Sequence, residues 1–175
     1  MTRAFVFPGQ GSQAVGMGHE LVATFPAARE TLEEIDDALG QNLSKLMAQG
    51  PADELQLTEN AQPALMALSM AVLRVLETEG GVDLSKSCAF VAGHSLGEYS
   101  ALAAARTFGL ADTARLLKVR GQAMQKAVPV GQGGMAALLG ADMDVAQEIA
   151  DAGFGNVTQT PMSGGIVWLH SGWRI

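Results

Sequence analysis

Residues 88–97 have the sequence Cys88-Ala89-Phe90-Val91-Ala92-Gly93-His94-Ser95-Leu96-Gly97. The first five predict a short buried strand, and the alanine-rich residues 96–106 predict a helix. Between them stands G-x-S-x-G, the pattern of a nucleophile elbow where a strand turns into a helix. The two glycines permit a sharp turn that presents Ser95 at the helix N-terminus, where N–H groups and the helix dipole favour negative charge. A plain structural turn is the alternative.

The composition describes one globular domain, or one domain and part of another, in 175 residues. Hydrophobic residues make up 48% and charged residues 17%, which argues against disorder. The net charge of −7 argues against a nucleic-acid partner. A single cysteine excludes an internal disulfide framework and fits a reducing compartment. Since we expect neither a signal peptide nor a membrane-spanning segment, the predicted location is cytoplasmic.

The chain alternates between predicted strands and helices. A strand over 4–7 leads into a glycine-rich loop, and apolar spacings of three and four residues predict helices over 25–39, 63–79 and 112–127. Gly40 is placed to end the first of these helices, and Asp112 to cap the last. This order predicts an α/β fold, with a mostly parallel sheet and helices on both faces.

A second, smaller unit is predicted to begin at residue 131, after a run of glycines. A strand over 135–139 and a helix over 144–152 are expected there. From Gly153 onward no regular element is predicted, because the tail has neither an apolar period nor clear caps. Both tryptophans lie in this tail, and Arg174 is its only charged residue.

The loop after the first strand allows two uses. Gly9 to Ala14 fits the dinucleotide fingerprint G-x-G-x-x-G/A, which needs an acidic residue after a second strand about 20 residues on. Glu30, Glu33 and Glu34 lie at that distance but on a predicted helix, so a nucleotide site is disfavoured. We expect the loop to lay its backbone N–H groups beside the elbow as half of an oxyanion hole. A tight turn without a site remains open.

Arg120 lies among apolar positions of the helix over 112–127. A surface arginine covering apolar neighbours is the simpler interpretation, and a bidentate clamp for a carboxylate is the functional one.

A serine nucleophile also needs a base, normally a histidine. His94 adjoins the serine but is expected to point to the other side of the elbow. His19 is expected at the surface, and His170 lies in the tail. Cys88 is expected to be a buried strand residue rather than a nucleophile.

Four segments, in order and in register, resemble one family, the malonyl-CoA:acyl carrier protein transacylases of bacterial fatty acid synthesis. The segments are FVFPGQGSQ at 5–13, TENAQPAL at 58–65, GHSLGEYSAL at 93–102 and RGQAMQ at 120–125. The resemblance covers about residues 3–152, the N-terminal portion of such an enzyme. The start at Met1 resembles the free-standing enzyme more than a module of a larger synthase.

The resemblance implies a role for each matching position. Ser95 would attack the malonyl thioester, and the backbone N–H groups of Gln10 and Leu96 would form the oxyanion hole. The implied substrate-binding side chains are Arg120, paired with the free malonyl carboxylate, Gln62 and Met124. Malonyl would pass from malonyl-CoA to Ser95 and then to the phosphopantetheine thiol of acyl carrier protein. No cofactor, metal, nucleic acid or membrane is implied.

The resemblance also implies the domain plan. Residues 1–130 would form the large subdomain, an α/β-hydrolase-like acyltransferase core whose later strands are missing. Residues 131–175 would begin a small ferredoxin-like subdomain, with an anomalous tail from about residue 157. The family's catalytic histidine follows that subdomain and is absent from this chain. From about residue 157 the apolar pattern, the charge balance and the resemblance are lost together, so we expect a reading-frame shift near residues 157–162. We expect the resulting truncated chain to be poorly soluble or partly folded and inactive or weakly active.

Two other functions fit part of the pattern. A serine esterase of the α/β-hydrolase type shares the elbow but does not call for Arg120. A non-catalytic fragment that binds acyl carrier protein would keep the surface of the enzyme without turnover.

Overall fold

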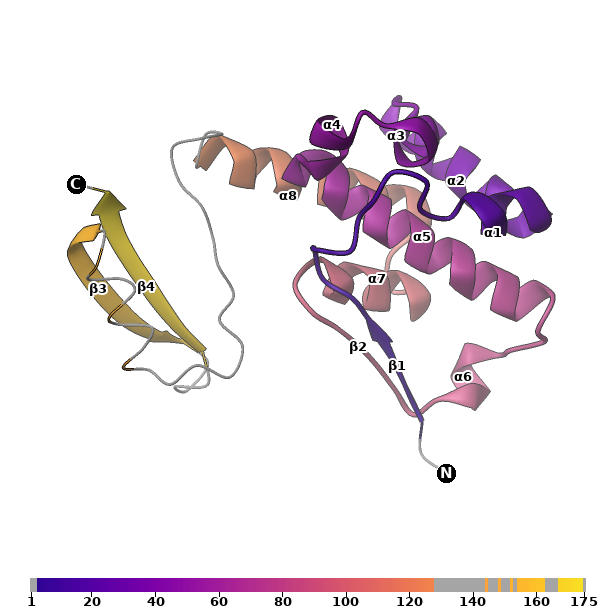
Figure 1. The fold of residues 1–175 in the computed structure, drawn as a ribbon. Coiled ribbons are helices and arrows are strands. Elements are labelled where there is room, and N and C mark those ends of the chain that lie inside the picture. Colours follow the sequence, from indigo (N-terminus) through magenta and orange to yellow (C-terminus); the bar gives the residue numbers. More distant parts are fainter. Residues whose placement is uncertain are drawn as a thin grey trace. The chain divides into compact units, whose positions relative to one another are not determined.

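The structure, a computed structural model, describes residues 3–127, 144, 148, 152, 154–162 and 167–174. The chain divides into two compact units, Met1–Gly133 and Gly134–Ile175. The first unit contains a parallel pair of strands and all the helices labelled in Figure 1, and the second contains an antiparallel pair of strands.

The parallel pair consists of β1 (Ala4–Phe7) and β2 (Phe90–Gly93), in register from Ala4 opposite Phe90 to Phe7 opposite Gly93. Helix α7 (Leu96–Ala104) packs on one face of this pair. On the other face Val6 is 73% and Phe90 67% exposed. The predicted parallel pairing is confirmed, whereas in the described part of the chain helices cover one face of the sheet and not both.

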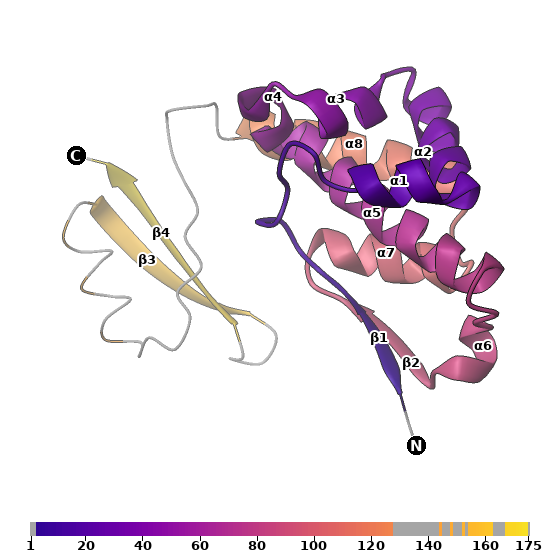
Figure 2. The same cartoon turned by 45° about the vertical axis from the view of Figure 1, so that its right-hand side comes forward.

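Helices form successive layers above the strands. In Figures 1 and 2, α7 lies between the strands and the long helix α5 (Thr58–Thr78), which packs in turn on α2 (Pro26–Leu39) and α8 (Leu110–Ala127). The shorter helices are α1 (His19–Thr24), α3 (Leu43–Gln49), α4 (Ala52–Gln56) and α6 (Leu84–Ser87). The innermost apolar side chains, at most 1% exposed, include Ile35, Met47, Met66, Leu96 and Leu117. In the described part of the chain, no helix is long and apolar enough to cross a membrane.

Two helices begin earlier in the chain than predicted. Helix α5 begins at Thr58 and contains Pro63, which was expected to begin it. The N–H groups of Asn60 and Ala61 both donate to the Leu57 carbonyl at 2.8 Å, so the first turn closes before the proline is reached. Helix α8 begins at Leu110, which places Asp112 in its first turn rather than ahead of it.

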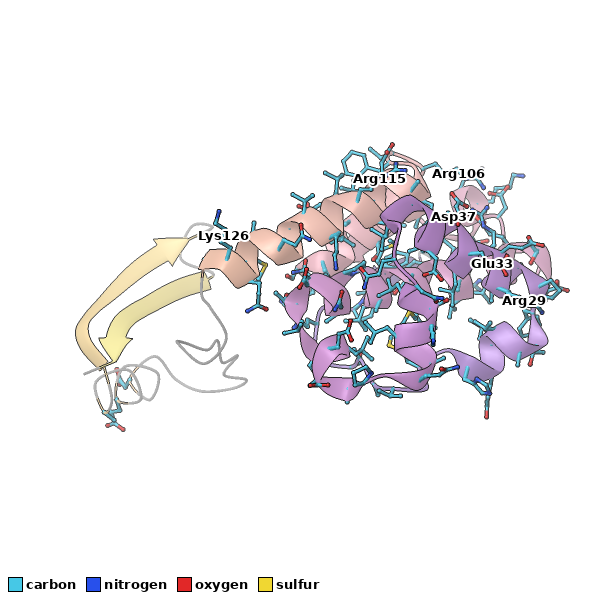
Figure 3. All side chains as sticks on the ribbon, turned by 90° about the horizontal axis from the view of Figure 1, so that it is seen from above. Arg29, Glu33, Asp37, Arg106, Arg115 and Lys126 are labelled. Carbon is cyan, nitrogen blue, oxygen red and sulfur yellow. The ribbon has the colours of Figure 1, made fainter. Side chains whose placement is uncertain are left out.

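The other predicted helix in the N-terminal region fits closely. Helix α2 ends at Gly40, whose left-handed conformation (φ 57°) is that of a helix-ending glycine. Arg29, Glu33 and Asp37 follow the exposed side of α2 at intervals of four residues (Figure 3). Arg115 of α8 donates a hydrogen bond of 3.1 Å to the carbonyl of Ala38, so α8 supplies a cation to the last turn of α2.

Helices α5 and α8 approach each other at a glycine. A Cβ at Gly121 of α8 would lie 2.4 Å from Cα of Glu59 and 2.7 Å from the carbonyl oxygen of Thr58. Real Cβ atoms do not come so close to backbone, so the distance between these helices requires glycine at this position. The contact lies at the N-terminal end of α5, within one turn of Gln62.

The second unit contains β3 (Phe154–Met162) and β4 (Val167–Arg174), which pair antiparallel from Phe154 opposite Arg174 to Met162 opposite Val167. A register shift interrupts the pairing between Gly155 and Thr158. The prediction of no regular element from Gly153 onward is therefore wrong. The spacing of apolar residues did not reveal these strands, because a hairpin is defined by pairing between its two strands as much as by alternation of apolar and polar residues.

Two predictions for the second unit fall mainly outside the described residues. The strand over 135–139 lies entirely outside them. Of the helix over 144–152, Asp144 and Glu148 are described and helical, and the N–H of Ala152 donates to the Glu148 carbonyl at 3.0 Å.

The close contact between α5 and α8 predicts that Gly121→Ala destabilises the protein by about 1–3 kcal/mol, because the helices must separate. This outweighs the gain of about 1 kcal/mol that alanine brings to a helix interior. Urea unfolding followed by circular dichroism measures the effect.

Gly109→Ala is the matched control, because the nearest atom to a Cβ there is 3.7 Å away. Equal changes in the two unfolding midpoints would show that Gly121 is not required for packing.

Candidate active site

The glycine-rich loop and the elbow lie at the same edge of the sheet. Since β1 and β2 are parallel and end opposite each other at Phe7 and Gly93, the turns that follow them emerge together. The N–H of His94 donates to the Phe7 carbonyl at 3.2 Å. A Cβ at Gly97 would lie 2.3 Å from the same carbonyl oxygen, so the start of the loop is packed directly against the elbow.

Ser95 stands at the turn itself, with φ 56° and ψ −112°, immediately before α7. A positive φ is strained for a residue with a side chain and is found mainly where the surrounding structure imposes it. A Cβ at Gly93 would overlap Gly97, at 1.9 Å from its carbonyl carbon. The backbone therefore crosses itself closely at the serine, as a nucleophile elbow requires, and the Ser95 side chain is exposed.

Arg120 reaches this serine from α8. Its Nη2 donates to Ser95 Oγ at 3.1 Å and its Nη1 to Gln62 Oε1 at 2.5 Å. The guanidinium carbon also lies 5.8 Å from the ring centroid of Tyr99, a cation–π distance. The arginine is half-buried and held on two sides. The interpretation of Arg120 as a surface arginine covering apolar neighbours does not fit this geometry.

Gln62 is the buried centre of the site. Its side chain is fully buried, at 0% exposure, in the second turn of α5. Besides accepting from Arg120, it donates from Nε2 to Thr58 Oγ1 at 2.9 Å and to the sulfur of Met124 at 3.3 Å. Met124 follows Arg120 by one turn on α8, so these two side chains approach Gln62 from the same helix face.

The loop contributes Gln10, whose side-chain oxygen accepts a hydrogen bond of 2.9 Å from the hydroxyl of Thr58. The backbone N–H groups of Gln10 and Leu96 donate to no other backbone group among the described residues. Leu96 is the first residue of α7, where N–H groups lack helical partners. Their predicted role as oxyanion donors stays a prediction.

Among the described residues, no hydrogen bond between a histidine and the Ser95 hydroxyl is recorded; the recorded partner of this hydroxyl is Arg120. The His94 ring lies over the loop, so that a Cβ at Gly9 would be 2.5 Å from its Nδ1. His19 is exposed at the start of α1. His170 lies on β4 in the second unit. Cys88 is half-buried, precedes β2 and donates to the Leu84 carbonyl at 3.3 Å, which is a structural role.

Two residues of the site escaped the sequence analysis, Thr58 and Tyr99. Thr58 precedes Gln62 by four residues and Tyr99 follows Ser95 by four, so each lies one helical turn from a predicted site residue. That spacing was the available signal.

Comparison with known proteins gives a consistent result. The family profile described as the acyl transferase domain matches residues 4–163, which extends past residue 152, where the resemblance was expected to end. The malonyl CoA-acyl carrier protein transacylase of Salmonella typhimurium is 52% identical over 139 residues, which cover 79% of this chain and 44% of that protein.

Solved structures agree with this result. The acyl-carrier-protein-S-malonyltransferase of Bartonella henselae has 60% identity and a TM-score of 0.79, over 87% of this chain and 48% of that one. A malonyl-transacylase solved in complex with a type II PKS acyl-carrier protein has 41% identity and a TM-score of 0.77, over 93% and 52%. The chain thus spans about half the length of the relatives that it matches.

Because the backbone at residue 95 is strained, we expect the free energy of unfolding of Ser95→Gly to exceed that of Ser95→Ala by about 1 kcal/mol. Both variants lose the hydroxyl, but only glycine relieves the positive φ, a gain of about 1–3 kcal/mol that the flexibility of glycine in the unfolded chain reduces. Urea unfolding of the two variants side by side makes the comparison. An alanine variant at least as stable as the glycine variant would mean that the elbow is unstrained.

Proposed function

Because the chain belongs to the acyl transferase domain family, we propose that it transfers a malonyl group from malonyl-CoA to the phosphopantetheine thiol of acyl carrier protein. The transfer passes through an ester on Ser95 and serves fatty acid biosynthesis. The names of the relatives support this substrate pair, since they are malonyl transferases acting with acyl carrier proteins.

The observation that carries the proposal is the position of Arg120, with Nη2 3.1 Å from Ser95 Oγ. A guanidinium is always charged and presents paired N–H donors that match a carboxylate. An acyl group bound at Ser95 therefore meets a fixed positive charge, which favours an acyl group ending in a free carboxylate. A plain esterase has no use for a cation at this place.

The chemistry follows from the groups around Ser95. Its oxygen attacks the thioester carbonyl of malonyl-CoA, forming a C–O bond, while the carbonyl oxygen takes negative charge near the N–H groups of Gln10 and Leu96. The C–S bond then breaks and coenzyme A leaves as a thiol. In the second half-reaction the thiol of the carrier protein attacks the Ser95 ester, and the serine hydroxyl is regenerated.

Each half-reaction needs a group that accepts and returns the serine proton. Arg120 donates to Ser95 and cannot accept that proton. The hydrogen bonds recorded within the described residues give Ser95 Oγ no histidine or carboxylate partner. We expect this chain to bind the malonyl thioester selectively. The rate at which the Ser95 ester forms reports whether a base reaches the serine, since a triad without its base loses several orders of magnitude in rate.

The remaining parts of the proposal concern organisation. We assign residues 1–130 to the large α/β subdomain and residues 131–175 to the start of a ferredoxin-like subdomain. The division of the chain after Gly133 and the antiparallel pairing of β3 with β4 support this assignment. The reaction needs no metal or cofactor beyond its two substrates. A cytoplasmic location suits the single cysteine of the chain.

Selectivity for the free carboxylate gives the test. We expect malonyl-CoA to bind at least about tenfold more tightly than acetyl-CoA, and Arg120→Gln to abolish that preference, because the charged partner is lost. Isothermal titration calorimetry measures both affinities. Mass spectrometry of protein incubated with malonyl-CoA should locate the malonyl adduct on Ser95.

Arg115→Gln is the matched control, since Arg115 is also on α8 but contacts Asp112 and the Ala38 carbonyl instead of the site. This variant should keep the preference for malonyl-CoA. Equal affinities of the unmodified protein for the two thioesters would refute the proposed substrate class.

A further inference from the structure

Thr58 occupies an unusual place for a helix-terminal threonine. It is the first residue of α5, where a short hydroxyl side chain often bonds to backbone N–H groups. Here its hydroxyl bonds instead to two side chains from different parts of the site: it donates to Gln10 Oε1 and accepts from Gln62 Nε2, both at 2.9 Å. Thr58 thus joins the loop after β1 to the buried glutamine of α5.

These bonds belong to a chain of hydrogen bonds with a single direction. Arg120 has donors and no acceptor, so the Gln62 side chain must turn its oxygen toward Arg120 and its nitrogen toward Thr58. The Thr58 oxygen therefore accepts, which leaves its one proton to be donated to Gln10. The charge of Arg120 sets the orientation of each later member, and Ser95 is attached at the arginine end.

Because Gln62 is buried, the middle of this series of hydrogen bonds cannot lose a partner without a cost in stability. Gln62 is fully buried, and a buried amide N–H without a partner is costly. The sulfur of Met124 is its other recorded acceptor and a weak one. Gly121 holds α8 against Thr58 and Glu59, so the helices cannot move apart to admit a replacement partner without losing packing.

On the premise of the malonyl-transfer function above, we propose that Thr58 is a positioning residue. Its hydroxyl couples the side that binds the acyl carboxylate, Gln62 and Arg120, to the Gln10 loop that supplies an oxyanion donor. A carboxylate that engages Arg120 then acts through Gln62 and Thr58 on the position of the Gln10 backbone N–H. The site is thereby adjusted for oxyanion binding when a dicarboxylic acyl group is present.

The first test needs no ligand. In ¹⁵N NMR spectra of the 175-residue chain, Thr58→Val, which keeps the shape and removes both hydrogen bonds, should shift the Gln62 side-chain amide, the Arg120 Nε and the Gln10 backbone N–H signals. Thr58→Ser should leave them near their original positions. Thr78→Val is the matched control, because Thr78 lies on the same helix and its hydroxyl donates to the Arg74 carbonyl away from the site.

The second test adds malonyl-CoA and acetyl-CoA as probes. Thr58→Val should weaken binding of malonyl-CoA by about tenfold and leave acetyl-CoA binding unchanged, whereas Thr58→Ser should restore binding to within about twofold. On addition of malonyl-CoA, the Gln10 N–H signal should move in the unmodified protein and in Thr58→Ser but not in Thr58→Val. A purely structural role would weaken both thioesters alike.

The outcomes separate the two proposals. Should Thr58→Val leave the three NMR signals in place, or should Gln10 still respond to malonyl-CoA in that variant, the coupling role is overturned. Should the unmodified protein fail to prefer malonyl-CoA while Thr58→Val still shifts all three signals, the hydrogen-bond chain stands and the substrate assignment fails. If Thr58→Val does not fold, Gln10→Ala removes the acceptor on the exposed loop, and it should shift the Gln62 amide signal.

Discussion

The site depends on one constraint, the parallel pairing of β1 and β2 with their last residues, Phe7 and Gly93, opposite each other. In a parallel pair the two carboxyl ends share an edge, so the loop after β1 and the elbow after β2 must meet. A slip of β1 by one residue would turn Phe5 and Phe7, which pack in the core, toward the open face. Burial of these side chains therefore fixes the register, and the register fixes the site.

Three helices, α5, α7 and α8, carry the side chains of the site. Helix α7 carries the serine at its N-terminus, Arg120 of α8 contacts that serine, and Gln62 of α5 contacts Arg120. Their reach depends on the close approach of α8 to the first turn of α5 at Gly121. In the proposed function, recognition of the acyl group is built between two helices, and the turn that follows β2 presents the reacting atom. Packing between these layers therefore sets the position of Arg120 and Gln62 relative to Ser95.

Much of this arrangement was predictable from the sequence, because strong local signals coincide with it. The elbow around Ser95, the amphipathic helices and the glycine at position 40 each depend on neighbouring residues. The early start of α5 depended on how a turn closes ahead of Pro63, which periodicity does not report. The expected role of Arg120 came from family resemblance, whereas its contact with Ser95, between residues 25 apart, was not predicted. The hairpin of β3 and β4 depends on pairing between its arms, which single-strand patterns do not show.

One feature of the site has an electrostatic consequence. The recorded side-chain partners of Arg120 among the described residues, Ser95, Gln62 and Tyr99, are all neutral. Its positive charge is therefore not cancelled locally, although the chain as a whole carries a net charge of −7. At physiological ionic strength the field of distant charges is screened within about 8 Å, whereas a contact with Arg120 is screened much less. The protein as a whole therefore repels an anionic molecule at long range, while Arg120 attracts it at the serine. Added salt should raise the rate of association and weaken the contact with Arg120 only slightly.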